Sequence, residues 1–245
     1  MVSHRSPLRI LKTTALVVGM GILLVSLPGQ ALAGGWFKVA GGMSGMAMDD
    51  INNGDFRFYD YSAEGFNLST LDSGFSFSLH GGVGFSGNMA LGLSWERQHA
   101  HTSGTDIDVQ ANLKLDAEFF MLHYYWIPLQ TGSWEFGAAA GLGLIFPNGK
   151  IDITDDNNVN YGEGQISGGS DVAYEVMLVG DWKYGRSTSL ELTLGYRVGV
   201  LDDVKLDSAP VYNEDGSRLE LDYTGYTIKA GFKFMFGGDA PDDIN

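Results

Sequence analysis

The chain has 245 residues, with 15 Lys and Arg against 30 Asp and Glu, so its formal net charge is −15 and it lacks the basic surface that nucleic acid requires. It has no Cys, which excludes disulfides, thiolate metal sites and cysteine nucleophiles. Its 35 Gly are about twice the usual share, without the period of collagen.

The first 33 residues have the pattern of a secretory signal peptide. Arg5, Arg9 and Lys12 precede the apolar stretch Ala15–Leu27, which is followed by Ala31-Leu32-Ala33. The alternative, a transmembrane anchor, needs about 20 apolar residues, and this stretch is shorter. We therefore predict cleavage after Ala33, which leaves a barrel domain at 34–236 and a short acidic tail at 237–245.

Beyond Ala33 apolar and small or polar residues alternate, which is the period of a strand with two different faces. In Gly74–Phe85, for example, Phe75, Phe77 and Leu79 alternate with small and polar residues. The pattern predicts eight strands, at Trp36–Met48, Gly74–Phe85, Met89–Gln98, 107–121, Trp134–Phe146, Val172–Tyr184, Ser189–Leu201 and Tyr223–Phe236.

The predicted connections alternate between long and short. The short ones, 86–88, 128–133 and 185–188, consist of turn-forming residues. The long ones are 49–73, 99–106, 147–171 and 202–222. The sequence thus predicts an all-β fold, an eight-stranded antiparallel up-and-down transmembrane β-barrel with four long loops and short turns.

A soluble eight-stranded barrel with a hydrophobic interior, as in lipocalins, would show the same alternation with its faces inverted. The leader and the loop asymmetry favour the membrane type, and so do aromatic residues near the short turns, which suit a girdle at one bilayer interface. The predicted girdle comprises Trp36, Phe37, Trp126, Trp134, Phe136, Trp182, Tyr184, Phe234 and Phe236. High Gly content fits the crowded interior of so small a barrel.

Two segments resemble the small eight-stranded outer-membrane proteins of Gram-negative bacteria, the outer-membrane protein A, X and W types. They are Gly137–Leu144 after a short turn and the closing strand Tyr226–Phe236, with its alternating aromatics. The family's closing strand ends the chain in Phe, whereas Gly237–Asn245 follow here. The resemblance implies the outer membrane, its lipid and lipopolysaccharide, and the periplasmic chaperones and barrel-insertion machinery as partners. It implies no cofactor.

Assigning faces by alternation predicts a lumen with nearly balanced charges. Because an unpaired charge in a confined lumen is costly, we expect these side chains to form salt bridges and to occlude the barrel. The predicted inward residues are Lys38, Glu96, Lys114, Asp116, Glu118, Glu135, Glu175, Asp181, Lys183, Glu191, Arg197, Lys229 and Lys233. The same assignment places Phe120, Leu122, Tyr124 and Trp126 in the lumen as an apolar plug.

The excess acidic charge falls in connections and in the tail. The clusters are Asp49, Asp50 and Asp55; Asp152, Asp155 and Asp156; Asp202, Asp203 and Asp207; and Asp242 with Asp243. Solvated surface loops are the favoured interpretation, and binding of divalent cations is the alternative. The segment Asp156–Gly162 has alternating oxygen ligands but places its Gly one position late for an EF-hand loop.

The only enzyme hypothesis that the sequence supports is based on its histidines. His99, His101 and Ser103, with Asp106 nearby, contain the groups of a Ser–His site, and some lipid-modifying outer-membrane barrels use such groups. His99 and His101 also share a strand side, but a third metal ligand is not evident. His80 is expected in the lumen as a hydrogen-bonded residue.

The favoured function is that of a surface or structural protein of the outer membrane, without enzymatic activity. The alternative is transport of small hydrophobic solutes, and a lipid-modifying enzyme is the third hypothesis.

Overall fold

The computed structural model describes residues 34–52, 69–106, 109–155, 160–213 and 215–237. The predicted signal peptide, the tail beyond Gly237, and the acidic residues Asp55, Asp156, Asp242 and Asp243 lie outside the described residues. In the part that is described, no helix is long and apolar enough to cross a membrane.

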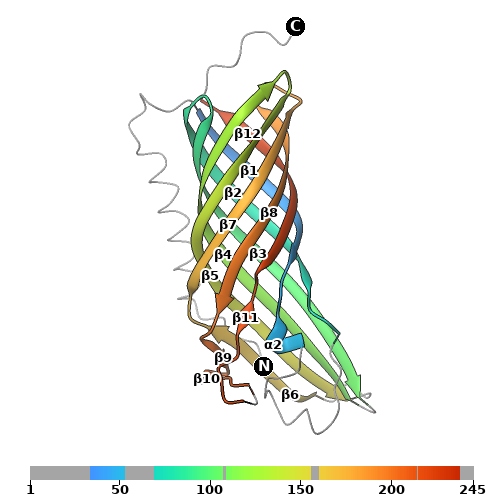
Figure 1. The fold of residues 1–245 in the computed structure, drawn as a ribbon. Helices are drawn as coiled ribbons and strands as arrows, with labels where there is room; N and C mark the ends of the chain where they lie inside the picture. Colours follow the sequence, from blue (N-terminus) through green and yellow to red (C-terminus); the bar gives the residue numbers. More distant parts are fainter. Residues whose placement is uncertain (1–33, 53–68, 107–108, 156–159, 214, 238–245) are drawn as a thin grey trace.

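Eight long antiparallel strands form a closed ring (Figure 1). They are β1 (Gly34–Gly45), β2 (Ser73–Ser86), β3 (Met89–Asp106), β4 (Val109–Thr131), β5 (Trp134–Asp155), β7 (Asp171–Lys183), β8 (Thr188–Leu201) and β12 (Gly225–Phe236). Each strand pairs with the next, and β12 pairs with β1, with Lys38 opposite Lys233. The predicted eight-stranded barrel is thereby confirmed.

Tight turns join the strands at one end. At the other, which we call the outer end, longer segments join β1 to β2, β5 to β7 and β8 to β12, whereas only residues 107–108 separate β3 from β4. The outer end carries the helical turn α2 (Asp49–Asn52) and the short strands β6 (Asn160–Gly168), β9 (Val204–Leu206), β10 (Ala209–Pro210) and β11 (Leu221–Asp222). At the other end Gly132, with φ of 56°, closes the turn between β4 and β5.

Two of the predicted long loops are largely strand. The segment 99–106 continues β3, and its residues pair with β4 up to Asp106 opposite Val109. The segment 147–171 contains the outer part of β5 and then β6, which folds back on it with Lys150 opposite Gln165. These hairpins therefore extend the wall on one side of the barrel beyond the ends of β1, β2, β8 and β12 (Figure 1).

The polarity of the wall inverts along the barrel axis, as β5 shows. Near the short turn its outward side chains are apolar, beginning with Trp134 and Phe136, and its inward ones include Glu135 and Gly137. Near the outer end its inward side chains are Ile145, Ile151 and Ile153, all buried, while the outward ones are polar. One part of the barrel thus has a polar interior and an apolar outside, and the outer part has the opposite arrangement.

The outer part is filled by a continuous apolar cluster. Inward side chains of the extended hairpins, among them Leu113, Leu115 and Phe119, pack against residues from the connecting segments, including Ile51 and Leu219. All five are at most 2% exposed. The connecting segments therefore cap the outer end with a core of the soluble-protein type.

Close strand packing explains part of the glycine content. A Cβ at Gly143 would lie 2.0 Å from the carbonyl oxygen of Phe120, and one at Gly42 would lie 1.9 Å from that of Ile228. Only glycine permits such approaches without displacing the neighbouring strand.

Candidate functional site

The most highly organised polar group in the described structure is a cluster of charges in the lumen. Its centre is Arg197 of β8, whose guanidinium donates two hydrogen bonds to Glu96 of β3, at 2.9 and 2.8 Å. The same guanidinium donates to Glu175 of β7 at 3.0 Å. All three side chains are at most 3% exposed, so these ion pairs lie inside the wall.

Lys229 of β12 completes this cluster. Its Nζ lies 2.5 Å from a Glu96 oxygen and 3.4 Å from a Glu175 oxygen. The Thr227 hydroxyl and the His123 Nε2 each lie 3.2 Å from Glu175 oxygens. Two carboxylates and two cations therefore neutralise one another across four strands, and the remaining carboxylate oxygens also have partners.

A second cluster lies closer to the short turns. Lys38 contacts Glu191 at 2.5 Å, and Lys233 contacts Asp181 at 2.5 Å and Glu191 at 3.8 Å. Nearer the rim, Lys183 contacts Glu135 at 2.5 Å. Together the two clusters contain five carboxylates and five cations, so these lumen charges balance.

Aromatic side chains bound the charged lumen at both ends. At its outer limit, the Arg197 guanidinium carbon lies 4.0 Å from the centre of the Phe119 ring, which belongs to the apolar outer core. Toward the short turns, Trp36 packs edge-on against Tyr125, with ring centres 5.4 Å apart. Lys233 lies 5.6 Å from the Trp36 ring. The central cluster of Arg197, Glu96, Glu175 and Lys229 thus lies between these two aromatic contacts, whereas the Lys183–Glu135 pair lies nearer the rim.

The structure brings together most of the residues predicted for the lumen. Those found in these ion pairs are Lys38, Glu96, Glu135, Glu175, Asp181, Lys183, Glu191, Arg197, Lys229 and Lys233. The prediction was wrong for Glu118, which lies on the outward face of β4.

Lys114 and Asp116 share that outward face, and so do the residues predicted as an apolar plug, Phe120, Leu122, Tyr124 and Trp126. The reason is that β4 extends past the apolar band. Its outward face is apolar within the band and charged beyond it. An assignment that places charged side chains in the lumen therefore turns the outer part of this face inward, which is wrong.

The predicted girdle needs one correction. Trp36 points into the barrel and is 8% exposed. The remaining residues are exposed on the outside: Phe37, Trp126, Trp134, Phe136, Trp182, Tyr184, Phe234 and Phe236. Among them Trp134 stacks on Phe136 and on Trp182, with ring centres 5.8 and 6.0 Å apart.

Sequence reasoning missed His123, which joins the central cluster. Its ring lies 5.9 Å from that of His80, and His80 in turn bonds to the Ser78 hydroxyl at 2.9 Å. Both histidines are buried. The sequence does contain a signal for the position of His123. If Tyr124 and Trp126 face outward, strict alternation directs His123 and Tyr125 into the lumen.

The residues of the enzyme hypothesis lie on the outward face of β3, where His99, His101 and Ser103 share one side of the strand. Nδ1 of His99 bonds to Asp116 at 2.5 Å, an oxygen partner that sequence reasoning did not name. Asp116 also accepts from Arg97 at 2.5 Å. The side chain of Asp106 lies outside the described residues.

The described acidic residues of the outer end mostly have structural partners. Asp50 accepts hydrogen bonds from the Asn213 side chain at 2.9 Å and from the Glu220 backbone at 2.8 Å. The hydrogen bond from Lys205 holds the pKa of Asp203 below its usual value, with the Lys205 and Arg218 charges adding to the effect. Within the described ranges, no group of three or more His, Asp or Glu has the arrangement of a metal site.

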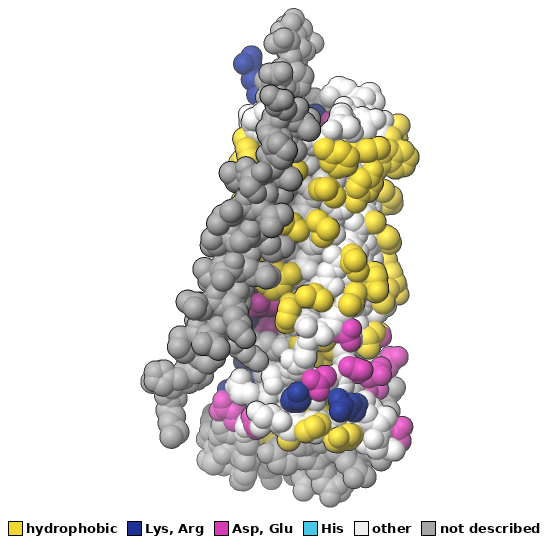
Figure 2. All heavy atoms as spheres, turned by 90° about the vertical axis from the view of Figure 1, so that its left-hand side faces the viewer, with side chains coloured by type: hydrophobic (Ala, Val, Ile, Leu, Met, Phe, Trp, Pro, Cys, Tyr) yellow, Lys and Arg dark blue, Asp and Glu magenta, His cyan; other side chains and the backbone are white. Residues whose placement is uncertain are grey.

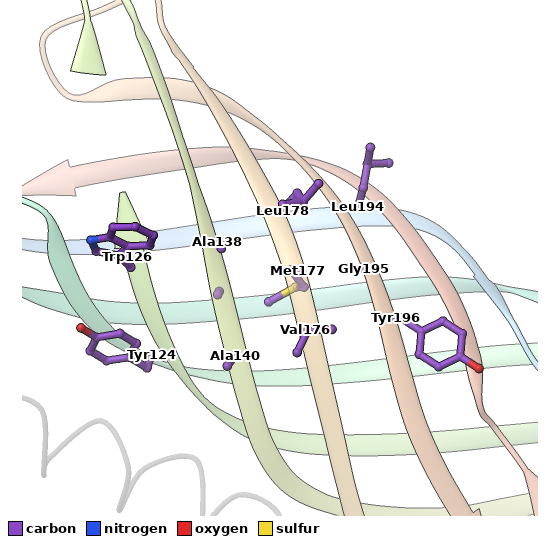
Figure 3. Close-up of a pocket in the computed structure, with 11 residues that line it drawn as sticks. Tyr124, Trp126, Ala138, Ala140, Val176, Met177, Leu178, Leu194, Gly195 and Tyr196 are labelled. Carbon is purple, nitrogen blue, oxygen red and sulfur yellow. The ribbon is translucent and has the colours of Figure 1, made fainter. Parts of the chain in front are cut away.

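The outer wall carries an apolar groove of about 580 Å³ within the apolar band (Figure 3). Small side chains of β5 form its floor, and larger ones of β4, β7 and β8 form its sides. The lining includes Tyr124, Trp126, Ala138, Ala140, Val176, Met177, Leu178, Leu194, Gly195 and Tyr196.

No protein-family model matches the chain, and no curated protein matches it. Solved structures of similar fold include the outer membrane protein OprG from Pseudomonas aeruginosa, with 15% identity over 86% of this chain and 99% of that one, at a TM-score of 0.48. Neisserial surface protein A has 10% identity over 84% of this chain and 100% of that one, at a TM-score of 0.46. The attachment invasion locus protein Ail of Yersinia pestis has 14% identity over 83% of this chain and 99% of that one, at a TM-score of 0.42. The chain is thus similar to small outer-membrane β-barrel proteins, as its sequence pattern indicates, and the similarity is one of fold.

Proposed function

We propose that the protein is an integral outer-membrane barrel of a Gram-negative bacterium, with an occluded, salt-bridged lumen, that acts as a surface or structural protein. The observation that carries this proposal is the apolar band on the outside of a charged interior. On β7 the outward side chains from Val172 to Trp182 are all apolar or Gly and mostly exposed. At about 3.3 Å per residue and a tilt of about 40°, this stretch covers about 25 Å of membrane thickness, the height typical of such barrels.

The ion pairs support the occluded lumen. A conducting pore of one selectivity needs water-filled space and rings of one charge sign, whereas these carboxylates and cations neutralise one another across the barrel. Trp36 and Tyr125 fill the lumen toward the short turns, and the apolar core fills the outer end.

The predicted signal peptide supports export, and the usual orientation of such barrels places short turns in the periplasm and the longer hairpins outside. The protein would then display the capped outer end at the cell surface. Periplasmic chaperones, the insertion machinery and lipopolysaccharide are its expected partners.

Fractionation and gel migration test the membrane assignment. The full chain, expressed with its leader, should appear in the outer-membrane fraction after carbonate washing and should migrate differently on gels before and after heating. Recovery as a soluble periplasmic protein would contradict the assignment.

Planar-bilayer recording of the same heat-modifiable preparation tests the closed lumen. We expect no steady conductance, because each large charged side chain of the lumen is held by a partner of opposite sign. A steady open level would overturn the occluded lumen while leaving the membrane assignment intact.

Two observations favour a second candidate, the transport of small hydrophobic solutes. The interior of the outer end is apolar, and the groove over Ala138 and Ala140 opens on the lipid side of the wall. Filling the groove with Ala140→Leu should slow uptake of an apolar dye into vesicles that contain the barrel, if solutes leave there. Ala230→Leu, on the outward face of β12, is the matched control. Equal uptake with and without the barrel would exclude this candidate.

A lipid-modifying enzyme is the third candidate, and only the histidine pair on β3 favours it. Loss of a lipid modification in His99→Ala would support this role, whereas unchanged outer-membrane lipids with and without the protein would exclude it.

A further inference from the structure

Two histidines face each other inside the lumen. His80 of β2 and His123 of β4 are both buried, and their rings stack with centres 5.9 Å apart and planes inclined by 30°. The strand between them, β3, places Ser94 opposite His80 and Gly92 opposite His123. On the other side of His123 lies Gly141 of β5, where a Cβ would come within 2.5 Å of the ring. Small residues therefore leave room for the two rings, which we call the histidine pair, to meet across β3.

The hydrogen bonds of the histidine pair fit two neutral rings. Nε2 of His123 lies 3.2 Å from an oxygen of the Glu175 carboxylate, which only accepts, so Nε2 carries the proton. Nδ1 of His123 lies 3.5 Å from the Ser94 hydroxyl, which can donate to it. In His80, Nε2 contacts the Ser78 hydroxyl at 2.9 Å, whereas Nδ1 is buried and has no hydrogen-bond partner among the described residues. A second proton on His80 would therefore create a buried N–H without an acceptor.

The charges that surround the histidine pair balance without it. They are Lys38 of β1, Glu96 of β3, Glu175 and Asp181 of β7, Glu191 and Arg197 of β8, and Lys229 and Lys233 of β12, and the neutral Tyr125 of β4 also lies beside His123. Each of these carboxylates already contacts a cation. The outside of the wall carries hydrophobic side chains (Figure 2), so the membrane side supplies no counter-ion for an added positive charge.

Protonation would bring like charges together. Lys38 lies directly opposite His80 in the strand register. His123 shares Glu175 with Lys229. Two protonated rings would also place two positive charges 5.9 Å apart. Because a buried charge is costly unless it is paired, the closed lumen favours the neutral histidine pair.

We propose that the histidine pair is a pH-sensitive switch of the closed lumen, which is stable with both rings neutral and loosens when acid protonates them below about pH 6. This inference rests on the occluded, salt-bridged lumen proposed above. The rings join β2 to β4, and through Glu175 they reach the ion pairs of β7, β8 and β12. Positive charge added at the pair therefore acts on the whole central cluster.

The test compares unfolding of the full-length folded barrel in detergent micelles at about pH 7.5 and about pH 5, with heat modifiability as the check of folding. The variants are His80→Gln/His123→Gln and the matched control His99→Gln/His101→Gln, which removes two histidines from the exposed outward face of β3. His80→Gln alone leaves the bond of His123 to Glu175 in place and serves if the double variant does not fold.

The expected size of the effect follows from proton linkage. A histidine that is neutral in the folded barrel, and that titrates with the ordinary pKa of about 6.5 once unfolded, raises the equilibrium constant of unfolding about 30-fold between these pH values. The unfolded chain then binds more protons, so stability falls as the pH falls. Carboxylates titrate mostly below this range, and their contribution is common to all variants.

We expect acid to weaken the wild type and His99→Gln/His101→Gln alike, by about 30-fold or more beyond the change in His80→Gln/His123→Gln. His80→Gln alone should remove about 30-fold of the wild-type change. Equal acid sensitivity with and without the buried histidines would overturn the proposal, and so would its loss in the exposed-pair control. Either result leaves the closed lumen standing, because planar-bilayer recording at neutral pH tests that closure separately.

Discussion

At the scale of single residues, Arg197 illustrates how much depends on pairing inside the lumen. Its two bonds to Glu96 and one to Glu175 neutralise carboxylates that have no access to water. Replacing it leaves Lys229 as the only cation shared by both. The structure therefore makes Arg197 a main determinant of lumen stability.

We predict that Arg197→Met lowers the free energy of unfolding by about 3 to 5 kcal/mol, because it leaves buried carboxylates without a partner. The measurement is urea unfolding in detergent micelles, followed by tryptophan fluorescence. Arg97→Met removes an exposed ion pair with Asp116 and should cost less than about 1 kcal/mol. Similar losses in the two variants would contradict a buried network.

The sequence predicts correctly which residues face the lumen on the strands that stay within the apolar band. Glu175, Asp181, Glu191 and Arg197 lie on β7 and β8, whose inner faces alternate regularly with apolar outer faces. Trp36 was not predictable in this way, because an aromatic residue near a strand end suits both a girdle and a lumen plug. Its contact with Tyr125 comes from a strand distant in the sequence.

At the scale of the elements, β4 shows why alternation alone is insufficient. The strand has 23 residues, far more than the 9 to 11 or so that span a membrane. Its period-two pattern correctly gives two faces, but in the proposed membrane location the medium outside changes from lipid to water along its length. The face that carries Glu118 and Leu122 is therefore a single outward face with two compositions.

Two lysine substitutions on this face distinguish its apolar part from its charged part. Leu122→Lys should destabilise the folded barrel by about 2 to 4 kcal/mol, because it places a charge against the lipid core. Glu118→Lys, four residues away on the same face, should cost about 1 kcal/mol or less, because that position lies near the interface. Unfolding in phosphatidylcholine vesicles measures both, and a larger loss for Glu118→Lys would place this face inside the barrel instead.

At the scale of the whole molecule, the barrel combines two kinds of interior on one set of strands. The part within the apolar band encloses balanced charges, whereas the outer part encloses an apolar core closed by α2 and by residues of the β8–β12 connection. The strands of both parts can be predicted from the sequence. The contacts of the cap cannot, since Ile51, Leu71 and Leu219 come from segments without periodicity.

The outer core and the apolar outside of the wall should respond differently to the same Leu→Ala truncation. Leu115 is fully buried in the outer core, whereas Leu178 is 65% exposed on the apolar band. Leu115→Ala should cost about 2 to 5 kcal/mol through the cavity it leaves. Leu178→Ala should cost only about 0.5 kcal/mol, because lipid fills the space beside it. Unfolding measurements in micelles give both values, and limited proteolysis shows where the molecule opens.

Leu115→Ala should expose the outer connections to protease while the barrel remains heat-modifiable. Equal losses in the two variants, with no change in proteolysis, would mean that the outer end has no core of its own.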